Sequence, residues 1–515
     1  MPRNHQDTEV RTPAATHDSA GNPLIIQGGM GVGVSGWRLA RAVAHTGQLG
    51  VVSGVALDAL LARRLQDGDR DGRIRRTLAR FPAPALVQRV VERYFVPGGR
   101  PDGTSYRPVP RLGLRPRRDG LELAVLGNFV EVLLAKDGHH GPVGVNYLEK
   151  TQMATPAAVY GAMLAGVDYV LMGAGLPTEI PRLLHALAEH RCVRLPVSVQ
   201  EAAPGQQFHA SFDPQDLLGV APAAVRRPRL LAIVSSATLA LYLARDDATR
   251  PDGFVVESPV AGGHSARPRG ALRLTADGEP VYGPRDRVDL PKIAALGLPF
   301  WTAGGQCGPA GLSAAHASGA VGVQVGSAFA LCRESGLDDR LRRRLLHDAM
   351  RGALVVRNRA GVSPTGFPFK VAHLPGTAAD ERVYADRPRR CDLGYLRSPY
   401  QRPDGKVGFR CPAEPVDEYL RKGGVVQDTV GSRCLCNGLV ASVGLGQRRP
   451  DGYHEPPLLT LGQDLAFLPA LIGTGDDYSA ADVVNYVLGT SVAGSSDASG
   501  GHPGPSTATR PAPDR

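Results

Sequence analysis

The amino-acid sequence predicts an α/β fold in which eight parallel strands alternate with helices to form a (β/α)8 barrel. Short, wholly apolar runs alternate with amphipathic helical segments from Pro23 onward, and such runs are typical of parallel strands that are covered on both faces. Eight strand–helix units fit into roughly 330 residues, a length that suits a barrel with insertions. A doubly wound open sheet is the alternative fold, but it usually has fewer strands.

The first five predicted strands lie between residues 23 and 236. Their sequences are PLIIQGGM, LGVVSG, PVGVNYL, VDYVLMGAG and LLAIVSS. Helical patterns follow four of them, in SGWRLARAVAHTG, TPAAVYGAMLAG, PTEIPRLLHALAEH and ATLALYLARD. The apolar segment RLPVSVQ is not counted as a barrel strand, because it leads into EAAPGQQFHASFDP, which resembles an excursion and not a crossover helix.

The remaining three strands are predicted in DGFVVESP, PFWTAGG and AVGVQVGSAF. The helical segments LPKIAALG and PAGLSAAHASG separate them. Each strand run is short, apolar and bounded by Gly or Pro, which is the pattern of a buried parallel strand. The barrel domain is therefore predicted to span residues 21–349.

Two regions do not follow the strand–helix repeat. Residues of about 55–141 contain charged helical segments and a Pro/Arg-rich loop, which predicts a helical insertion after the second strand. Residues 350–489 show little periodicity, so we expect an irregular C-terminal extension that packs on the barrel. Residues 1–20 and 490–515 are polar or low in complexity and predict disordered tails.

Composition and charge limit the classes of function. The net charge is +10, but the arginines are interspersed with acidic residues and aromatic residues make up 5%, so no nucleic-acid partner is expected. No run approaches the ~18 apolar residues of a membrane helix, and the N-terminus lacks the apolar core of a secretory signal. We therefore expect a cytoplasmic protein without a membrane partner. The odd number of cysteines, seven, disfavours a disulfide framework.

Glycines and small polar residues gather at the predicted carboxyl ends of the strands, where barrels of this class carry their sites. So many glycines indicate a backbone that packs against a flat or phosphorylated ligand. The loops after the seventh and eighth strands are where this fold commonly binds phosphate. The candidates at these ends are Gly28, Gly29, Met30, Asn146, Gly173, Gly175, Ser235, Ser236, His264, Gly304, Gly305, Gly326 and Ser327.

The stretch VESPVAGGH places a histidine directly behind two glycines. Glycines allow a close approach of the backbone to a ligand, and His264 could face the same ligand. A tight turn whose polar residue happens to be histidine is the other interpretation.

Several of these motifs carry a family resemblance. PLIIQGGMGVGVSGWRLARAVAHTGQLGVVSG, VGVNYL, VAGGH, AGG and GVQVGSAF occur over about residues 23–335. In this order they resemble the nitronate monooxygenases, a family of FMN-dependent TIM barrels, of which this chain would be a long variant with a C-terminal extension. The resemblance implies that FMN is bound, with Gly28, Gly29 and Met30 against the isoalloxazine and Asn146 hydrogen-bonded to its polar edge.

The same resemblance assigns the remaining site residues. His264 matches the active-site histidine of the family, which faces the flavin. The flavin ring and the phosphate would be held by Gly263, Gly304, Gly305, Gln324, Gly326 and Ser327.

The implied reaction is the oxidation of alkyl nitronates or nitro compounds by O2 to a carbonyl compound and nitrite. With an ordinary imidazole pKa near ~6.5, His264 could remove a proton or orient the anion. FMN-dependent enoyl-thioester (enoyl-ACP) reductases resemble the sequence too, and a barrel that binds flavin or phosphate without turnover is a third possibility. The expected partners are O2 and a small molecule, either a nitronate or an acidic or thioester compound; the oligomeric state stays open.

Two further groups of residues leave alternatives open. Arginines in the loop after His264 could bind an acidic substrate or could be solvated; they are Arg267, Arg269, Arg273, Arg285 and Arg287. Four cysteines fall in the extension, but their spacing lacks the paired C-x2-C of zinc sites, so no metal is expected and buried thiols are favoured. They are Cys391, Cys411, Cys434 and Cys436.

Overall fold

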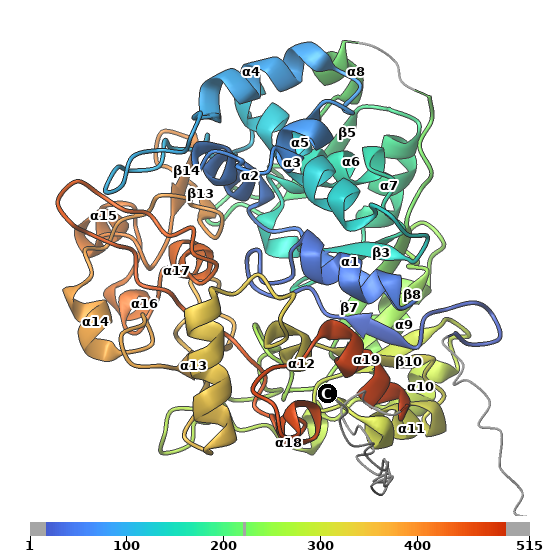
Figure 1. The fold of residues 1–515 in the computed structure, drawn as a ribbon. Coiled ribbons are helices and arrows are strands. Elements are labelled where there is room, and N and C mark those ends of the chain that lie inside the picture. The colour runs from blue at the N-terminus through green and yellow to red at the C-terminus, as the bar shows by residue number, and fades with distance from the viewer. Residues whose placement is uncertain (1–16, 220–222, 491–515) are drawn as a thin grey trace, which may run out of the picture.

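The computed structural model describes residues 17–219 and 223–490. Its centre is an eight-stranded parallel sheet with the strand order β1-β10-β9-β8-β7-β4-β3-β2 (Figure 1). The strands are β1 (Ile25–Gln27), β2 (Gly50–Ser53), β3 (Val143–Leu148), β4 (Tyr169–Gly173), β7 (Arg229–Val234), β8 (Gly253–Glu257), β9 (Phe300–Ala303) and β10 (Gly322–Val325). The predicted disordered tails fall almost wholly on residues outside the described ranges.

The two strands at the ends of this order also meet. Gln27 N–H donates to Leu49 O at 2.9 Å and Leu49 N–H donates to Ile25 O at 3.1 Å, which joins β1 to the residue before β2. The sheet is thus closed into a barrel, and the predicted fold class is confirmed. Its interior is filled by apolar side chains from several strands, among them Leu171 and Trp301, which are fully buried.

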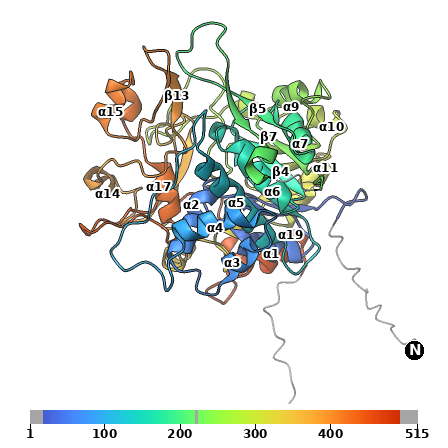
Figure 2. The same cartoon turned by 90° about the horizontal axis from the view of Figure 1, so that it is seen from above.

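Helices surround the barrel (Figure 2). Seven of them follow a strand directly or after an insertion: α1 (Trp37–His45), α5 (Arg118–Ala135), α6 (Thr155–Leu164), α7 (Ile180–Ala188), α9 (Ala237–Ala244), α10 (Leu290–Ala294) and α11 (Pro309–Ala317). The eighth place is taken by α19 (Ala480–Leu488), which contacts both α1 and α11. The chain therefore leaves the barrel after β10 and returns to complete it near residue 490.

The segment RLPVSVQ lies outside the barrel, as predicted. It forms β5 (Val193–Val197), which pairs antiparallel with β6 (Phe208–Phe212) in a separate hairpin. The short helix α8 (Pro214–Leu218) follows, with Asp213 as its N-cap.

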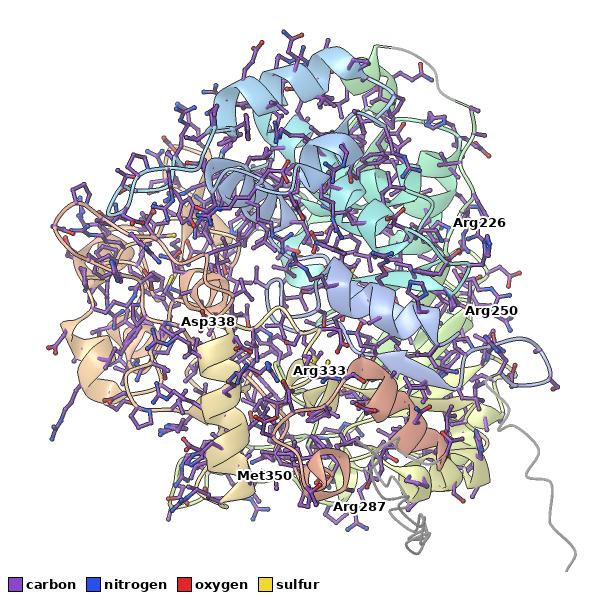
Figure 3. The ribbon with its side chains drawn as sticks, in the orientation of Figure 1. Arg226, Arg250, Arg287, Arg333, Asp338 and Met350 are labelled. Carbon is purple, nitrogen blue, oxygen red and sulfur yellow. The ribbon has the colours of Figure 1, made fainter. Side chains whose placement is uncertain are left out.

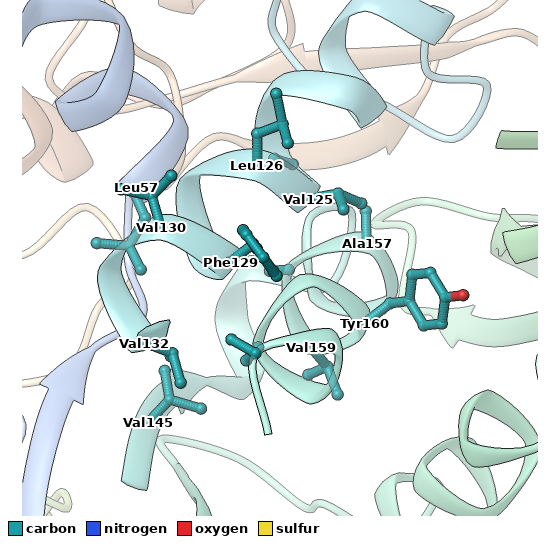
Figure 4. Close-up of a cluster of buried hydrophobic side chains, with 14 of the residues drawn as sticks. Leu57, Val125, Leu126, Phe129, Val130, Val132, Val145, Ala157, Val159 and Tyr160 are labelled. Carbon is teal, nitrogen blue, oxygen red and sulfur yellow. The ribbon is translucent and has the colours of Figure 1, made fainter. Parts of the chain in front are cut away.

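Three helices precede α5 in the region after β2. They are α2 (Leu57–Gln66), α3 (Arg73–Leu78) and α4 (Pro84–Tyr94). The long helix α5 is buried on nearly every side because it lies among these helices, α6 and the barrel (Figure 4). Phe129 of α5 packs edge-on against Phe81, with ring centroids 5.0 Å apart. The helix therefore buries residues on most of its sides, in contrast to the amphipathic α1.

The chain after β10 forms short helices and two hairpins, most of which gather on one side of the barrel (Figure 1). The helices are α12 (Ser327–Ala330), α13 (Asp339–Met350), α14 (Glu381–Asp386), α15 (Val416–Arg421), α16 (Val426–Thr429), α17 (Leu435–Ala441) and α18 (Leu468–Ile472), and the hairpins pair β11 (Val355–Arg359) with β12 (Phe369–His373) and β13 (Ser398–Gln401) with β14 (Val407–Arg410). Asp338 and Met350 mark the two ends of α13 in Figure 3. A buried ion pair between Arg387 and Glu455, at 2.7 Å, fixes loops within this region. The predicted domain boundaries stay a prediction.

Within residues 17–219 and 223–490, no helix has the length and the apolar character needed to span a membrane.

Replacing Leu126 of α5 by alanine should lower the free energy of unfolding by about 2–5 kcal/mol, because the side chain is fully buried and its removal leaves a cavity. Urea unfolding measures this loss. The matched control is Leu241→Ala on α9, where the leucine is 45% exposed, and its cost should stay below about 0.5 kcal/mol. Equal losses in the two variants would contradict the packing described for α5.

Candidate active site

The carboxyl ends of the barrel strands surround a cavity of about 490 Å3. Every residue that the sequence singles out for a catalytic or cofactor-binding role lines this cavity. These residues are Gly28, Gly29, Met30, Asn146, Gly263, His264, Gly304, Gly305, Gln324, Gly326 and Ser327. The fold thus brings the candidates together, while the role of each one stays a prediction.

A buried glutamine and a buried serine hold the turn that follows β1. Gln27 accepts a hydrogen bond from Val51 N–H at Oε1 and donates from Nε2 to Ser35 Oγ, both at 2.9 Å. Ser35 Oγ accepts from Met30 N–H and donates to Gly28 O, again at 2.9 Å. This network fixes the backbone of the turn that lines the cavity.

Gly29 packs directly against Asn146. A Cβ atom added to Gly29 would lie 2.4 Å from Asn146 Cβ, so only glycine fits at this position. Asn146 Nδ2 donates to the backbone carbonyls of Tyr147 and Leu171, at 3.0 and 3.3 Å. The amide oxygen is therefore the atom of Asn146 that remains for a ligand.

The loop after β9 presents its backbone to the cavity. Gly304 and Gly305 have φ angles of +93° and +69°, in the left-handed region that favours glycine. A Cβ atom on Gly304 would also lie 2.4 Å from Ser258 Oγ. Side chains are thus excluded here for reasons of both conformation and space.

Gln324 carries an unsatisfied polar atom into the site. Its Oε1 is buried and has no hydrogen-bond partner among the described residues, yet the residue lines the cavity. Buried acceptors without a partner are rare because they cost free energy. This oxygen is suited to accept a hydrogen bond from a bound ligand.

Two of the predicted phosphate-side residues already contact the C-terminal region. Ser327 Oγ accepts a hydrogen bond from Gly462 N–H at 2.7 Å. Gly263 N–H donates to Thr460 Oγ1 at 3.1 Å. The segment around residue 460 therefore supports both loops and uses hydrogen-bonding capacity that the sequence assigned to a ligand.

His264 is held in place by residues of the chain after β10. Its Nε2 hydrogen-bonds with Ser363 Oγ at 2.7 Å, and its ring lies 4.8 Å from that of Phe369. Burial, and secondarily the charge of Lys150, lower the pKa of His264 to about 4. The imidazole is therefore neutral near pH 7, whereas an ordinary histidine pKa would have left it partly charged.

Sequence reasoning missed a carboxyl group and a lysine next to this histidine. Glu257 ends β8 and lines the cavity. Lys370 of β12 is fully buried, and its Nζ donates to Pro259 O at 2.6 Å and to Ser265 Oγ at 2.8 Å. Glu257 could have been found as a charged residue that ends an apolar strand, but Lys370 carries no such signal.

Burial shifts both of these charged groups toward their neutral forms. It raises the pKa of Glu257 to about 7, although the charge of Lys370 opposes the shift. Burial lowers the pKa of Lys370 to about 8, against the opposing charges of Glu257 and Glu279. The site thus contains an acid and a base that titrate near neutrality.

The chain after β10 covers the cavity with a largely apolar roof. The residues that it contributes are Phe367, Phe369, Tyr395, Leu396, Leu435, Cys436, Leu439, Thr460, Leu461, Gly462, Asp464 and Phe467. No lysine or arginine is among the described residues that line the cavity. The surroundings of a ligand are therefore apolar at the roof and polar at the strand ends.

The arginines of the loop after His264 do not line the cavity. Arg267 donates to Gly366 O at 2.8 Å, and Arg269 donates to Ser235 O at the same distance. Both guanidinium groups thus fix loops by contacts to backbone carbonyls, and nothing in these contacts favours an acidic substrate.

The four late cysteines lie near one another, and Cys436 lines the cavity. Burial raises the pKa of Cys436 to about 11 and raises that of Cys411 further, so both thiols stay protonated at neutral pH. In the part of the chain that the structure describes, no group of three or more His, Cys, Asp or Glu side chains is arranged to hold a metal ion.

Comparisons with known proteins agree with the sequence motifs. A family model described as nitronate monooxygenase matches residues 193–367. A nitronate monooxygenase of Pseudomonas aeruginosa is 31% identical over 209 residues, which are 40% of this chain and 56% of that protein. One from Paraburkholderia phytofirmans is 31% identical over 159 residues, 30% of this chain and 40% of that protein. The chain thus spans about half the length of these curated relatives.

Among solved structures, FabK from Thermotoga maritima is similar over 90% of this chain and 91% of its own, with 17% identity and a TM-score of 0.44. The fold assignment depends on the strand pairing described above and not on this likeness. In the order of its motifs and over residues 193–367, which the family model matches, the chain is similar to the nitronate monooxygenases.

Proposed function

We propose that this protein is an FMN-dependent oxidoreductase that oxidises nitro compounds to carbonyl compounds and nitrite with O2. The observation that carries the proposal is the convergence of all the residues assigned by family resemblance on one cavity at the carboxyl ends of the strands. Relatives named nitronate monooxygenase support the same activity.

The residues at the cavity fit FMN. A flat ring can approach the turn at Gly28 and Gly29, the free oxygen of Gln324 needs a donor such as a ring N–H, and the glycine loop after β9 leaves room for a phosphate. When bound, FMN accepts two electrons from a substrate and passes them to O2. The cytoplasmic location stays a prediction.

The protein's own residues bind, orient and shield the substrate. The apolar roof with Leu396, Leu435 and Leu439 would hold an aliphatic chain and exclude water. His264 is neutral, so it acts as an uncharged hydrogen-bonding group whose position is fixed by Ser363.

The second candidate function is reduction of an enoyl thioester, which the apolar roof favours because it could hold an acyl chain. That reaction would draw its electrons from a reduced pyridine nucleotide. A barrel that binds flavin without turnover is the third candidate and predicts no reduction by either donor.

The proposed activity predicts that the purified protein is yellow and that its flavin is bleached under anaerobic conditions by an alkyl nitronate such as propyl-2-nitronate. Nitrite should appear after oxygen is admitted. Absorbance in the visible flavin band and a colorimetric nitrite assay measure the two steps. Bleaching by NADH or NADPH alone would favour the reductase, and a colourless protein that cannot be reconstituted with FMN would exclude both enzymes.

Replacing Gly304 by alanine should weaken FMN binding by tenfold or more, about 1.4 kcal/mol, because the new Cβ meets Ser258 Oγ at 2.4 Å in a strained backbone. Quenching of flavin fluorescence gives the dissociation constant. Gly270→Ala is the matched control, since Gly270 also has a positive φ, +99°, but lies in open space. A similar loss of FMN affinity in both variants would show that backbone strain alone, and not the contact with Ser258, weakens binding.

The low pKa of His264 predicts a pH-dependent stability. Since the unfolded state binds the proton more tightly, His264 should lower the free energy of unfolding by about 2 kcal/mol as pH falls from 7 to 5. The difference between wild type and His264→Gln in urea unfolding at several pH values isolates this contribution. A difference that does not change with pH would show that His264 keeps an ordinary pKa.

A further inference from the structure

The ionisable groups that line the cavity do not all suit proton transfer. Among the described residues they are Glu257, His264, Cys307, Tyr395, Cys436 and Asp464. Burial raises the pKa of Cys307 to about 12 and raises that of Tyr395 well above its ordinary value, so neither is a base at neutral pH. Cys436 is protonated for the same reason. Glu257, His264 and Asp464 remain.

Asp464 and His264 are less suited to this role. Asp464 is exposed, lies beside Gly305 and accepts a hydrogen bond from Ala466 N–H at 3.1 Å. His264 has one ring nitrogen engaged by Ser363. Its low pKa also makes it a weak base at the pH where the protein would work.

Glu257 differs from both in its contacts. It ends β8, in register with Ala303 of β9, at the edge of the sheet where barrels place their chemistry. No hydrogen bond or ion pair holds its carboxyl group among the residues that the structure describes, although the residue lines the cavity. Glu257 is half-buried, and a desolvated carboxyl group without a partner costs free energy, which indicates a role other than stability.

The charged and titratable groups around Glu257 come from two segments. Lys370 of β12 is the nearby cation, but it lies beyond ion-pair distance and its Nζ is bonded to Pro259 O and Ser265 Oγ. Tyr282 donates to Ala266 O and interacts with Glu257 only through its charge. The carboxyl group is therefore balanced by a positive charge without being neutralised by contact.

The absence of a lining lysine or arginine among the described residues also bears on the substrate. A nitronate anion would lose its hydration under the apolar roof without gaining a cation, which is unfavourable. A neutral nitroalkane enters such a cavity more readily, and its acidic carbon–hydrogen bond must then be broken inside.

We propose that Glu257 is the general base of this site and takes the proton from the carbon that bears the nitro group of a neutral aliphatic nitro compound. In this step the carbon–hydrogen bond breaks, its electron pair passes to the nitro group to give a nitronate, and the proton bonds to the Glu257 carboxylate. The carboxylic acid later returns the proton to water. The inference rests on the proposed function.

Comparison of a nitroalkane with its own nitronate tests this role, because the nitronate needs no proton transfer from carbon. In Glu257→Gln, the ratio of kcat/KM for 1-nitrobutane to kcat/KM for its nitronate should fall about 10²–10⁴-fold. Glu279→Gln is the matched control, because Glu279 also faces Lys370 but does not line the cavity, and its ratio should stay within about threefold of wild type. For the wild type, turnover of 1-nitrobutane should rise with pH through about 7.

A second measurement does not depend on turnover. The infrared difference spectrum of wild type minus Glu257→Gln, without substrate, should contain a protonated carboxyl band that disappears with a midpoint near pH 7. If Glu257→Gln folds poorly, Glu257→Asp is measured as well. This variant keeps a carboxyl group, so its own spectrum should retain the band. A carboxyl group that is fully ionised at pH 5 would overturn the proposal.

The outcomes separate this role from the proposed function. If wild type oxidises both compounds but the ratio is unchanged in Glu257→Gln, Glu257 is not the base, and the proposed function stands. If Glu257→Gln only loses FMN, the residue belongs to the cofactor site and the proposal is wrong. If wild type turns over neither nitro compound, the proposed function fails together with this step.

Discussion

The hydrogen bonds of one buried lysine join the two halves of this site. Lys370 reaches from β12 to both ends of the turn between residues 259 and 265, through Pro259 O and Ser265 Oγ. Its own N–H donates to Gly263 O at 2.9 Å, and Ser265 N–H donates to Pro368 O at the same distance. The turn that carries His264 is therefore held by the chain after β10 as well as by the barrel. A fully buried ammonium group is costly unless it is hydrogen-bonded and balanced by charge, and Glu257 supplies part of that balance.

This arrangement explains why the histidine and the carboxyl group depart from their ordinary pKa values in opposite directions. Both are half-buried and line the cavity under the roof, and desolvation disfavours the charged form of each. For His264 the charged form is the cation, so the pKa falls, and Lys150 lowers it further. For Glu257 the charged form is the anion, so the pKa rises, and Lys370 limits the rise. A single structural feature, the roof, thus gives the site a neutral imidazole and a carboxyl group poised near neutrality.

The sequence predicts the barrel and the set of lining residues well, because both depend on local patterns. Apolar runs that end in glycine mark the strands, and the residue after each run must lie at the rim, as Gly29 and Gly304 do. The contacts of the chain after β10 could not be predicted, since they join residues far apart in the sequence and involve ordinary side chains. Thr460 accepts a hydrogen bond from Gly263 N–H, and Gly462 N–H donates one to Ser327 Oγ. Both residues belong to a stretch of sequence without any motif. The altered pKa values follow from the same unpredicted burial.

The place of α19 makes the chain after β10 a part of the barrel and not an addition to it. The helix fills the eighth position between α11 and α1, and the segment before it reaches the site directly. Tyr478 OH donates to Ala328 O at 2.8 Å, beneath the loop that carries Ser327. Arg342 of α13, almost fully buried, forms two short bonds to Asp477 and so ties the intervening chain to this segment. Because the chain returns to the barrel at α19, the roof over Glu257 and His264 is joined to the barrel at both of its ends, after β10 and before α19.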